Sequence, residues 1–209
     1  MAALLTVQTN IDRFARRAAR GESGFSLIEV LISMAILTTG LVSLLGVFGL
    51  AMASTQTSQS AMIAKQLANE SYESIITARN TTQINWDDIQ NSGSTTCIVT
   101  GAATCGIFLS NMQQIYKAGA DGIYGTSDDS AAGEQQLQDP GPDGVFGNSD
   151  DTYIPLIGYQ RQITISPVLD ADGNTISSVR SVTITVQYTN PQTRLPQTYI
   201  LNSYISQFE

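Results

Sequence analysis

Histidine is missing from the whole 209-residue chain. It is the usual general base near neutral pH and a common metal ligand. Its absence argues against Ser–His–Asp and Cys–His catalytic groups and against imidazole metal sites. We therefore predict that the protein is not an enzyme.

Cysteine is also scarce. The only two, Cys97 and Cys105, lie in a stretch that is rich in glycine, serine and threonine. Cysteines of an exported protein meet an oxidising compartment, where they pair. We expect a Cys97–Cys105 disulfide, and the alternative is a pair of buried free thiols.

Basic residues are few, with 10 Lys and Arg against 18 Asp and Glu and a net charge of −8. The first 24 residues hold two more basic than acidic residues, so the rest of the chain moves from −8 to −10. Such a surface repels phosphate groups. We predict no nucleic-acid partner.

One long apolar run, residues 25–53, contains a single charged side chain, Glu29. As a helix it would extend about 43 Å, which exceeds the roughly 30 Å hydrocarbon core of a bilayer. Four arginines precede the run, and none of the next eleven residues after it is basic. This asymmetry predicts a single-pass segment with a cytoplasmic N-terminus and an outward C-terminal part.

A small residue, Gly24, stands before the run, whereas a secretory signal places its cleavage site after the apolar core. Cleavage of the Gly24–Phe25 bond would leave the helix on the product. Glu29 would cost about 2.5 to 3.5 kcal/mol at the bilayer centre and therefore needs a partner. The new α-amino group at Phe25 of a neighbouring chain is one such partner. The alternative is an acid tolerated near the interface.

The segment GFSLIEVLISMAIL, residues 24–37, closely resembles the cleavage and methylation motif of the type IV pilin superfamily. The resemblance implies that Gly24 ends a leader removed by a prepilin peptidase. It also implies that Phe25 is N-methylated and that Glu29 serves subunit recruitment and fibre packing. The implied partners are that peptidase, other pilin subunits and an inner-membrane assembly platform. The implied location is the bacterial inner membrane, followed by a pilus or a periplasmic pseudopilus.

The predicted fold is α+β, with a long N-terminal helix, transmembrane in its first half, packed on a small antiparallel β-sheet head. The amphipathic second half presents one apolar stripe at helical spacing. Its members are Ala61, Ala64, Leu67, Ala68, Tyr72, Ile75 and Ile76. Alternating residues predict three antiparallel strands within 160–169, 179–189 and 198–207. The predicted segments are the leader 1–24, the membrane or fibre-core helix 25–53, its continuation 54–80, a disulfide loop 81–118, an acidic insertion 119–153 and the sheet 154–209.

The acidic insertion contains an internal repeat, residues 119–129 and 141–151, in which seven of eleven positions are identical. Its Asp-Gly pairs predict tight turns. Residues 121–151 include no lysine or arginine, so their acids would repel one another, and calcium prefers oxygen ligands. We expect a Ca²⁺ site and no other cofactor; the alternative is a solvated acidic loop without an ion. The candidate ligands are Asp121, Asp128, Asp129, Asp143, Asp150 and Asp151.

Within the superfamily, the N-terminal helix looks most like PilV-type minor pilins, with minor pseudopilins of type II secretion next. We predict a structural subunit, a minor pilin that primes or modifies a type IV pilus. The alternative is a type II secretion pseudopilin. A second alternative is a membrane-anchored calcium-binding envelope protein that never polymerises.

Overall fold

The computed structural model describes residues 24–95, 97 and 105–208. The chain divides into two compact units, Met1–Ala51 and Met52–Glu209. The predicted leader lies outside the described residues except for Gly24, and so does part of the predicted disulfide loop.

Helix α2 (Leu27–Asn80) confirms the predicted long N-terminal helix and extends over 54 residues. At its first turn, the Ser26 carbonyl accepts hydrogen bonds from the N–H groups of Glu29 and Val30. At its end, the backbone turns away at Thr82, where φ is 55°. In the described part of the chain, α2 is the one helix long and apolar enough to cross a membrane.

In the second unit, α2 buries the apolar stripe that its spacing predicts. Ala64, Leu67, Ala68 and Ile75 are buried, and the other three predicted members are half-buried against the same core. Ser71 is also buried on this stripe, and its hydroxyl donates to the Leu67 carbonyl at 2.8 Å. That bond satisfies the hydroxyl inside the helix, so a polar residue is tolerated there.

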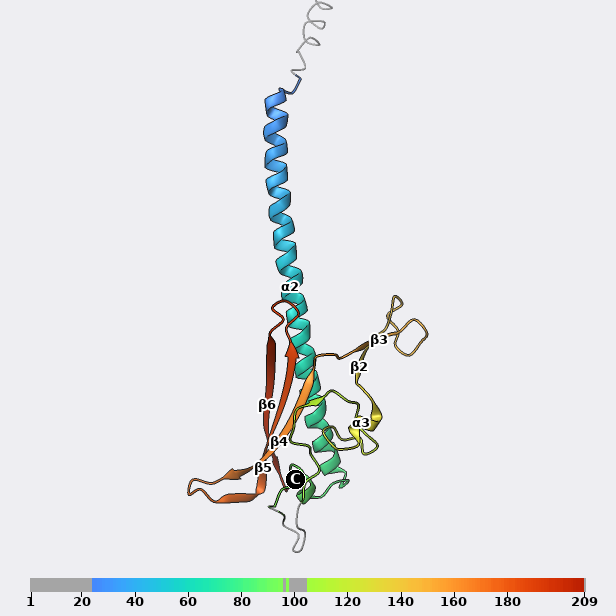
Figure 1. Cartoon of the computed structure of the whole chain (residues 1–209), viewed down its shortest axis with the longest axis vertical. Coiled ribbons are helices and arrows are strands. Elements are labelled where there is room, and N and C mark those ends of the chain that lie inside the picture. Colours follow the sequence, from blue (N-terminus) through green and yellow to red (C-terminus); the bar gives the residue numbers. More distant parts are fainter. Residues whose placement is uncertain (1–23, 96, 98–104, 209) are drawn as a thin grey trace, which may run out of the picture. The chain divides into compact units, whose positions relative to one another are not determined.

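The second unit contains an antiparallel sheet in the order β1-β4-β5-β6 (Figure 1). The three predicted strands are confirmed as β4 (Gln160–Leu169), β5 (Thr175–Thr189) and β6 (Pro196–Ser206). A short strand, β1 (Gln113–Gln114), adds to the β4 edge. Along β5, Val182, Ile184 and Val186 are buried and alternate with half-buried polar residues, which is the pattern of a sheet with one covered face.

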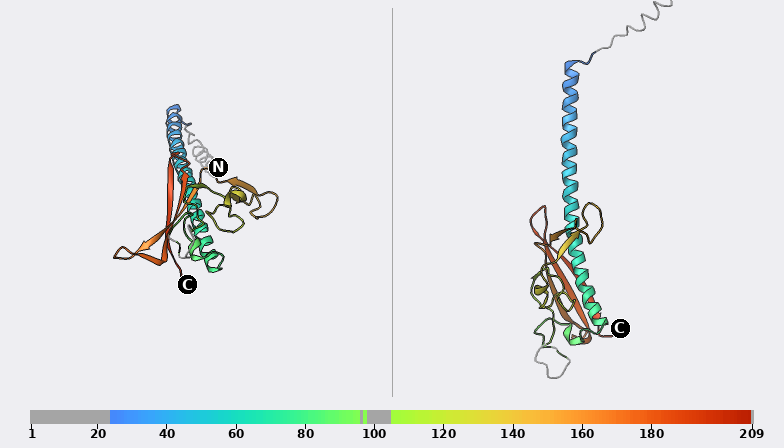
Figure 2. Two further views of the ribbon diagram at one scale, coloured as in Figure 1. Left: turned by 60° about the horizontal axis from the view of Figure 1, so that its bottom comes forward. Right: turned by 90° about the vertical axis from the view of Figure 1, so that its right-hand side faces the viewer.

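Helix α2 packs on the sheet through contacts that include hydrogen bonds of Tyr72 and Arg79. The Ser203 hydroxyl donates to the Tyr72 hydroxyl at 2.8 Å, and Arg79 Nη1 donates to the Ser206 carbonyl at 2.7 Å. Both views in Figure 2 show the sheet beside the C-terminal half of α2. The core between them also receives Ile89, Phe108, Ile115 and Ile123 from the connecting segments.

Two smaller features complete the second unit. Strands β2 (Gln136–Asp139) and β3 (Thr152–Pro155) form a separate hairpin whose connecting loop contains the second repeat copy. Figures 1 and 2 show this loop lying away from the four-stranded sheet. The 3-10 helix η1 (Trp86–Asp88) and the one-turn helix α3 (Asp129–Ala132) lie in the connecting segments. The predicted Cys97–Cys105 disulfide is present.

Candidate functional site

The first repeat copy uses its own carboxylates to hold its backbone in a tight loop. The Ile123 N–H donates to Asp121 Oδ1 at 2.8 Å, and the Gly125 N–H donates to Asp129 Oδ2 at 2.6 Å. The Gly119 N–H donates to the second oxygen of Asp129 at 3.0 Å. Asp129 therefore ties the beginning of the loop to its middle.

The three acids of the first copy converge. Asp121, Asp128 and Asp129 each place an oxygen within 4.8 Å of the others. The three candidate ligands of the second copy form no such group among the described residues. The structure thus brings together the first three of the six predicted ligands, and these three are the residues able to hold a hard cation such as Ca²⁺.

Hydrogen bonding and burial act differently on two of these acids. The Thr126 hydroxyl donates to Asp128 Oδ1 at 2.7 Å and holds the pKa of Asp128 below its usual value. Burial raises the pKa of Asp129, although the N–H groups of Gly125 and Gly119 act in the opposite direction. Asp129 is consequently the acid of this loop whose charge most needs a partner.

That partner is Arg161 on β4. Both side chains are buried, and Arg161 Nη2 lies 4.0 Å from Asp129 Oδ2. The guanidinium also lies over the Tyr124 ring, 4.6 Å from its centroid, in a cation–π contact. The acidic insertion contains no base of its own, but the fold brings one to it from β4. The repulsion that the sequence predicts is therefore reduced at Asp129 without any bound ion.

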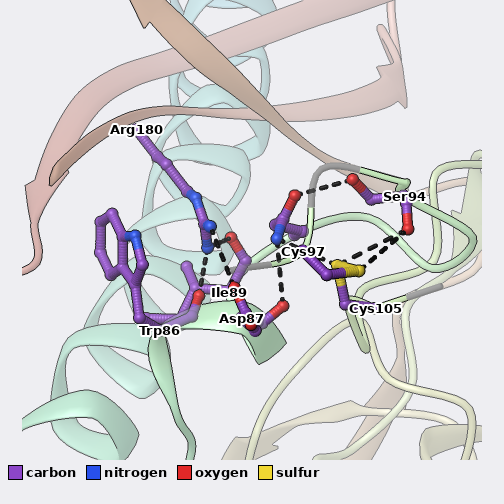
Figure 3. The surroundings of a disulfide bond; sticks show 8 residues. Trp86, Asp87, Ile89, Ser94, Cys97, Cys105 and Arg180 are labelled. Atoms are coloured by element: carbon purple, nitrogen blue, oxygen red, sulfur yellow. Dashed lines mark hydrogen bonds and ion pairs between the residues drawn. A yellow bond between two sulfur atoms is a disulfide. The ribbon is translucent and has the colours of Figure 1, made fainter. Parts of the chain in front are cut away.

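A second buried arginine, Arg180 on β5, has a similar arrangement (Figure 3). Its Nη2 lies 3.9 Å from Asp87 Oδ1, and its guanidinium lies 4.3 Å from the centroid of a Trp86 ring. Arg180 Nη1 donates to the Trp86 carbonyl and, at 2.9 Å, to that of Ile89. Arg180 thus fixes the segment that follows α2 to the sheet.

The N-terminal residues are arranged differently. Gly24 and Phe25 precede α2 and are exposed, and Glu29 lies in the first turn of the helix. Phe25 lies four residues before Glu29 and two residues before α2 begins. Residues 24–50 have no buried side chain.

Four hydroxyl groups in this apolar run donate hydrogen bonds within the helix. Ser33 donates to the Glu29 carbonyl at 2.7 Å, and Ser43 donates to the Thr39 carbonyl at 2.8 Å. Thr38 and Thr39 both donate to the Ala35 carbonyl at 3.0 Å. Because these hydroxyl groups are satisfied by the helix itself, they can be placed in surroundings without water. Glu29 is the single charged side chain of the run.

Residues 19–45 match the family model described as the prokaryotic N-terminal methylation motif. The chain carries that motif. No curated protein and no solved structure matches the chain. The motif covers Gly24, Phe25 and Glu29, and it supports a prepilin-type protein of the type IV pilin-like or pseudopilin kind. Together with the apolar helix, it indicates anchoring in a membrane through the N-terminus.

The methylation motif was visible in the sequence, but the two buried arginines were not among the predicted site residues. The sequence does contain a signal for these arginines, because strand residues that are two positions apart lie on the same face of the sheet. Arg161 is two residues from Ile163, and Arg180 is two residues from Val182. Each arginine therefore falls on the apolar face of its strand. An arginine at such a position indicates a buried ion pair, because charged groups are buried when they are paired.

Proposed function

We propose that this protein is a minor pilin, a structural subunit that primes or modifies a type IV pilus. The observation that carries the proposal is the methylation motif, joined to an apolar helical segment whose side chains are all exposed in the first unit. An uncovered apolar helix requires lipid or other apolar helices around it. A fibre of packed helices supplies the second of these environments.

In the proposed mechanism, a prepilin peptidase cuts between Gly24 and Phe25 and Phe25 is methylated. The new α-amino group of one subunit then pairs with Glu29 of its neighbour at the same depth. An ion pair in apolar surroundings is strong enough to fix the axial position of one helix against the next, provided that both charges are matched. The subunit waits in the inner membrane, with its N-terminus cytoplasmic, until an assembly platform moves it into the fibre.

Glu29→Gln tests this proposal, because glutamine keeps the size of the side chain and removes its charge. In the native bacterium we expect the amount of this subunit in sheared surface fibres to fall by about tenfold or more, since a lost charge partner in an apolar site costs several kcal/mol. The amount in membranes should stay unchanged. Glu73→Gln, an exposed acid on the same helix, is the matched control.

Three outcomes would contradict the minor-pilin role. One is wild-type incorporation of Glu29→Gln into fibres. Another is absence of the native protein from sheared fibres together with loss of folded-protein secretion when it is deleted, which would favour the pseudopilin alternative. The third is a mature protein whose N-terminus is still Met1, which would favour a permanently anchored envelope protein.

We also propose that Ca²⁺ binds the first repeat copy through Asp121, Asp128 and Asp129. Support comes from their convergence within 4.8 Å and from the preference of Ca²⁺ for clustered oxygens. Millimolar Ca²⁺ should then raise the melting temperature of the full-length protein in detergent by several degrees. Asp128→Asn should remove the gain, and Asp150→Asn in the second copy should keep it. An equal response in both variants would contradict the assignment.

A further inference from the structure

The two repeat copies share their central turn, although their first glycines, Gly119 and Gly141, differ in backbone conformation. The Val145 N–H donates to Asp143 Oδ1 at 2.8 Å, and the Gly147 N–H donates to Asp151 Oδ2 at 2.6 Å. The equivalent bonds of the first copy have the same lengths. The φ angles of two glycine pairs also agree, at 70° for both Gly122 and Gly144 and at 89° and 91° for Gly125 and Gly147. The second copy is therefore a formed loop with a scaffold of its own.

The surroundings of the two copies differ. In the first, Ile123 is 1% exposed in the core and Tyr124 is half-buried beneath Arg161. In the second, the equivalent Val145 and Phe146 are 57% and 62% exposed. The same scaffold thus presents one apolar pair to the core and the other to solvent.

In two places of this fold, one arginine contacts both an aromatic ring and a carboxylate; we call these two residues an aromatic–acid pair. Tyr124 and Asp129 both contact Arg161, and the neighbouring Trp86 and Asp87 both contact Arg180. Each pair lies in a connecting segment, and each arginine comes from the apolar face of a strand. The fold therefore uses one mode of docking twice. It combines burial of apolar surface, a cation–π contact and an ion pair.

The second copy carries a third such pair, Phe146 and Asp151, in positions equivalent to Tyr124 and Asp129. The structure gives this pair no arginine among the described residues. Asp151 Oδ2 accepts from the Gly147 N–H and from the uncharged side chain of Gln138, and Asp151 Oδ1 is enclosed by its own chain without a hydrogen-bond partner in the described residues. Asp129 Oδ1, its equivalent, accepts from Gly119.

We propose that the second repeat copy, residues 141–151, docks into a socket on a different protein. The socket is apolar, receives Val145 and Phe146, and contains an arginine that lies over the Phe146 ring and pairs with Asp151 Oδ2, as Arg161 pairs with Asp129 Oδ2. Residues 134–151 include five acids and no lysine or arginine, so charge complementarity also favours a basic partner. An anionic membrane surface is excluded as the ligand by the same charge.

In its described residues, a second copy of this chain offers no unoccupied arginine on an apolar strand face. Both arginines that lie on apolar strand faces, Arg161 and Arg180, already hold an aromatic ring and a carboxylate of their own chain. Binding of another loop would have to displace one of these buried pairs, and removal of one member of a buried ion pair is strongly destabilising. A different protein with an unoccupied arginine socket meets no such cost.

Site-specific photo-crosslinking tests the proposal. The full-length protein is produced in its own bacterium with a benzophenone amino acid in place of Phe146, and whole cells are irradiated. The control is the same amino acid in place of Leu169, which is 58% exposed near the β4–β5 turn. We expect a dominant adduct from position 146 with one different protein, crosslinked beside an arginine in an apolar pocket.

Two variants make the test specific to the proposed contacts. Asp151→Asn keeps an acceptor for the Gly147 N–H and removes the charge, so the adduct should fall about fivefold or more, as at a binding hot spot. Asp150→Asn, the neighbouring acid, should leave it unchanged. Mutation of the partner's arginine to alanine should reproduce the loss.

Several results would overturn the proposal: no light-dependent adduct, an adduct with lipid or with a second copy of this chain, a crosslinked site without arginine, or equal adducts from positions 146 and 169. The docking proposal stands apart from the fibre role. Loss of crosslinking contradicts docking alone, and wild-type assembly of Glu29→Gln contradicts the fibre role alone.

Discussion

At the scale of single residues, Arg161 decides how the acidic segment folds. Its guanidinium is buried between a carboxylate and an aromatic ring, and both contacts come from the first repeat copy. A buried charge is tolerated when it is paired, and removal of either partner leaves the other charge exposed to an apolar environment.

We therefore predict that Arg161→Met destabilises the second unit by about 3 to 5 kcal/mol, because Asp129 loses its buried partner. The double variant Arg161→Met, Asp129→Asn should lose less than the single variant, since no uncompensated charge is left. Urea unfolding of the full-length protein in detergent measures both. Arg194→Met, at an exposed position, should change the free energy of unfolding by no more than about 0.5 kcal/mol. A double variant less stable than Arg161→Met would contradict the pairing.

Asp128 gives a prediction for pH. The Thr126 hydroxyl lowers the pKa of Asp128 in the folded state relative to the unfolded state. A lowered pKa means that the folded state favours the charged form. Its contribution to stability is thus complete above the unfolded pKa of about 3.9 and is lost as the pH falls through the lower folded value. NMR titration of the Asp128 carboxyl should show a higher pKa in Thr126→Val, and an unchanged pKa would rule out the hydroxyl as the cause.

At the scale of elements, regular patterns made the fold predictable. Helical spacing located the buried stripe of α2, and alternation located β4, β5 and β6. Strand β1 could not be predicted because two residues show no period, and it exists through pairing with β4. The difference in burial between the two repeat copies could not be predicted either, because their local sequences are nearly the same. Burial of Ile123 and exposure of Val145 depend on contacts distant in the sequence.

The two parts of α2 should respond differently to the same substitution. Ile75 is 0% exposed in the core, so Ile75→Ala should reduce the free energy of unfolding by about 2 to 5 kcal/mol. Ile28 is 60% exposed, and Ile28→Ala should leave that unfolding transition unchanged. Circular dichroism during urea titration in detergent measures both. A similar loss from both variants would contradict the assignment of the core to residues beyond the apolar run.

At the scale of the whole molecule, the chain joins an apolar segment to an acidic unit. The first unit exposes apolar side chains along α2, and the mature chain has a predicted net charge of −10 once the first 24 residues are removed. These properties require different surroundings for the two units. The apolar surface of the first unit requires lipid or packed helices, and the acidic composition of the second is suited to water.

Processing should therefore change both mass and charge. We expect the protein extracted from bacterial membranes to begin at Phe25, and its isoelectric point should fall because two net positive charges leave with the leader. In a strain without prepilin peptidase, the same measurements should give a chain that begins before Gly24. Intact-mass spectrometry and isoelectric focusing provide the readings. Identical masses in both strains would contradict cleavage at this bond.

The repeat also bears on how the protein evolves. When a loop is duplicated and one copy packs in the core, mutations that disturb the packing of that copy are removed by selection for folding. The other copy inherits a self-supporting scaffold and is released from that constraint. Side chains at Val145 and Phe146 can then diverge at little cost to stability, whereas changes at the buried Ile123 of the core copy are costly.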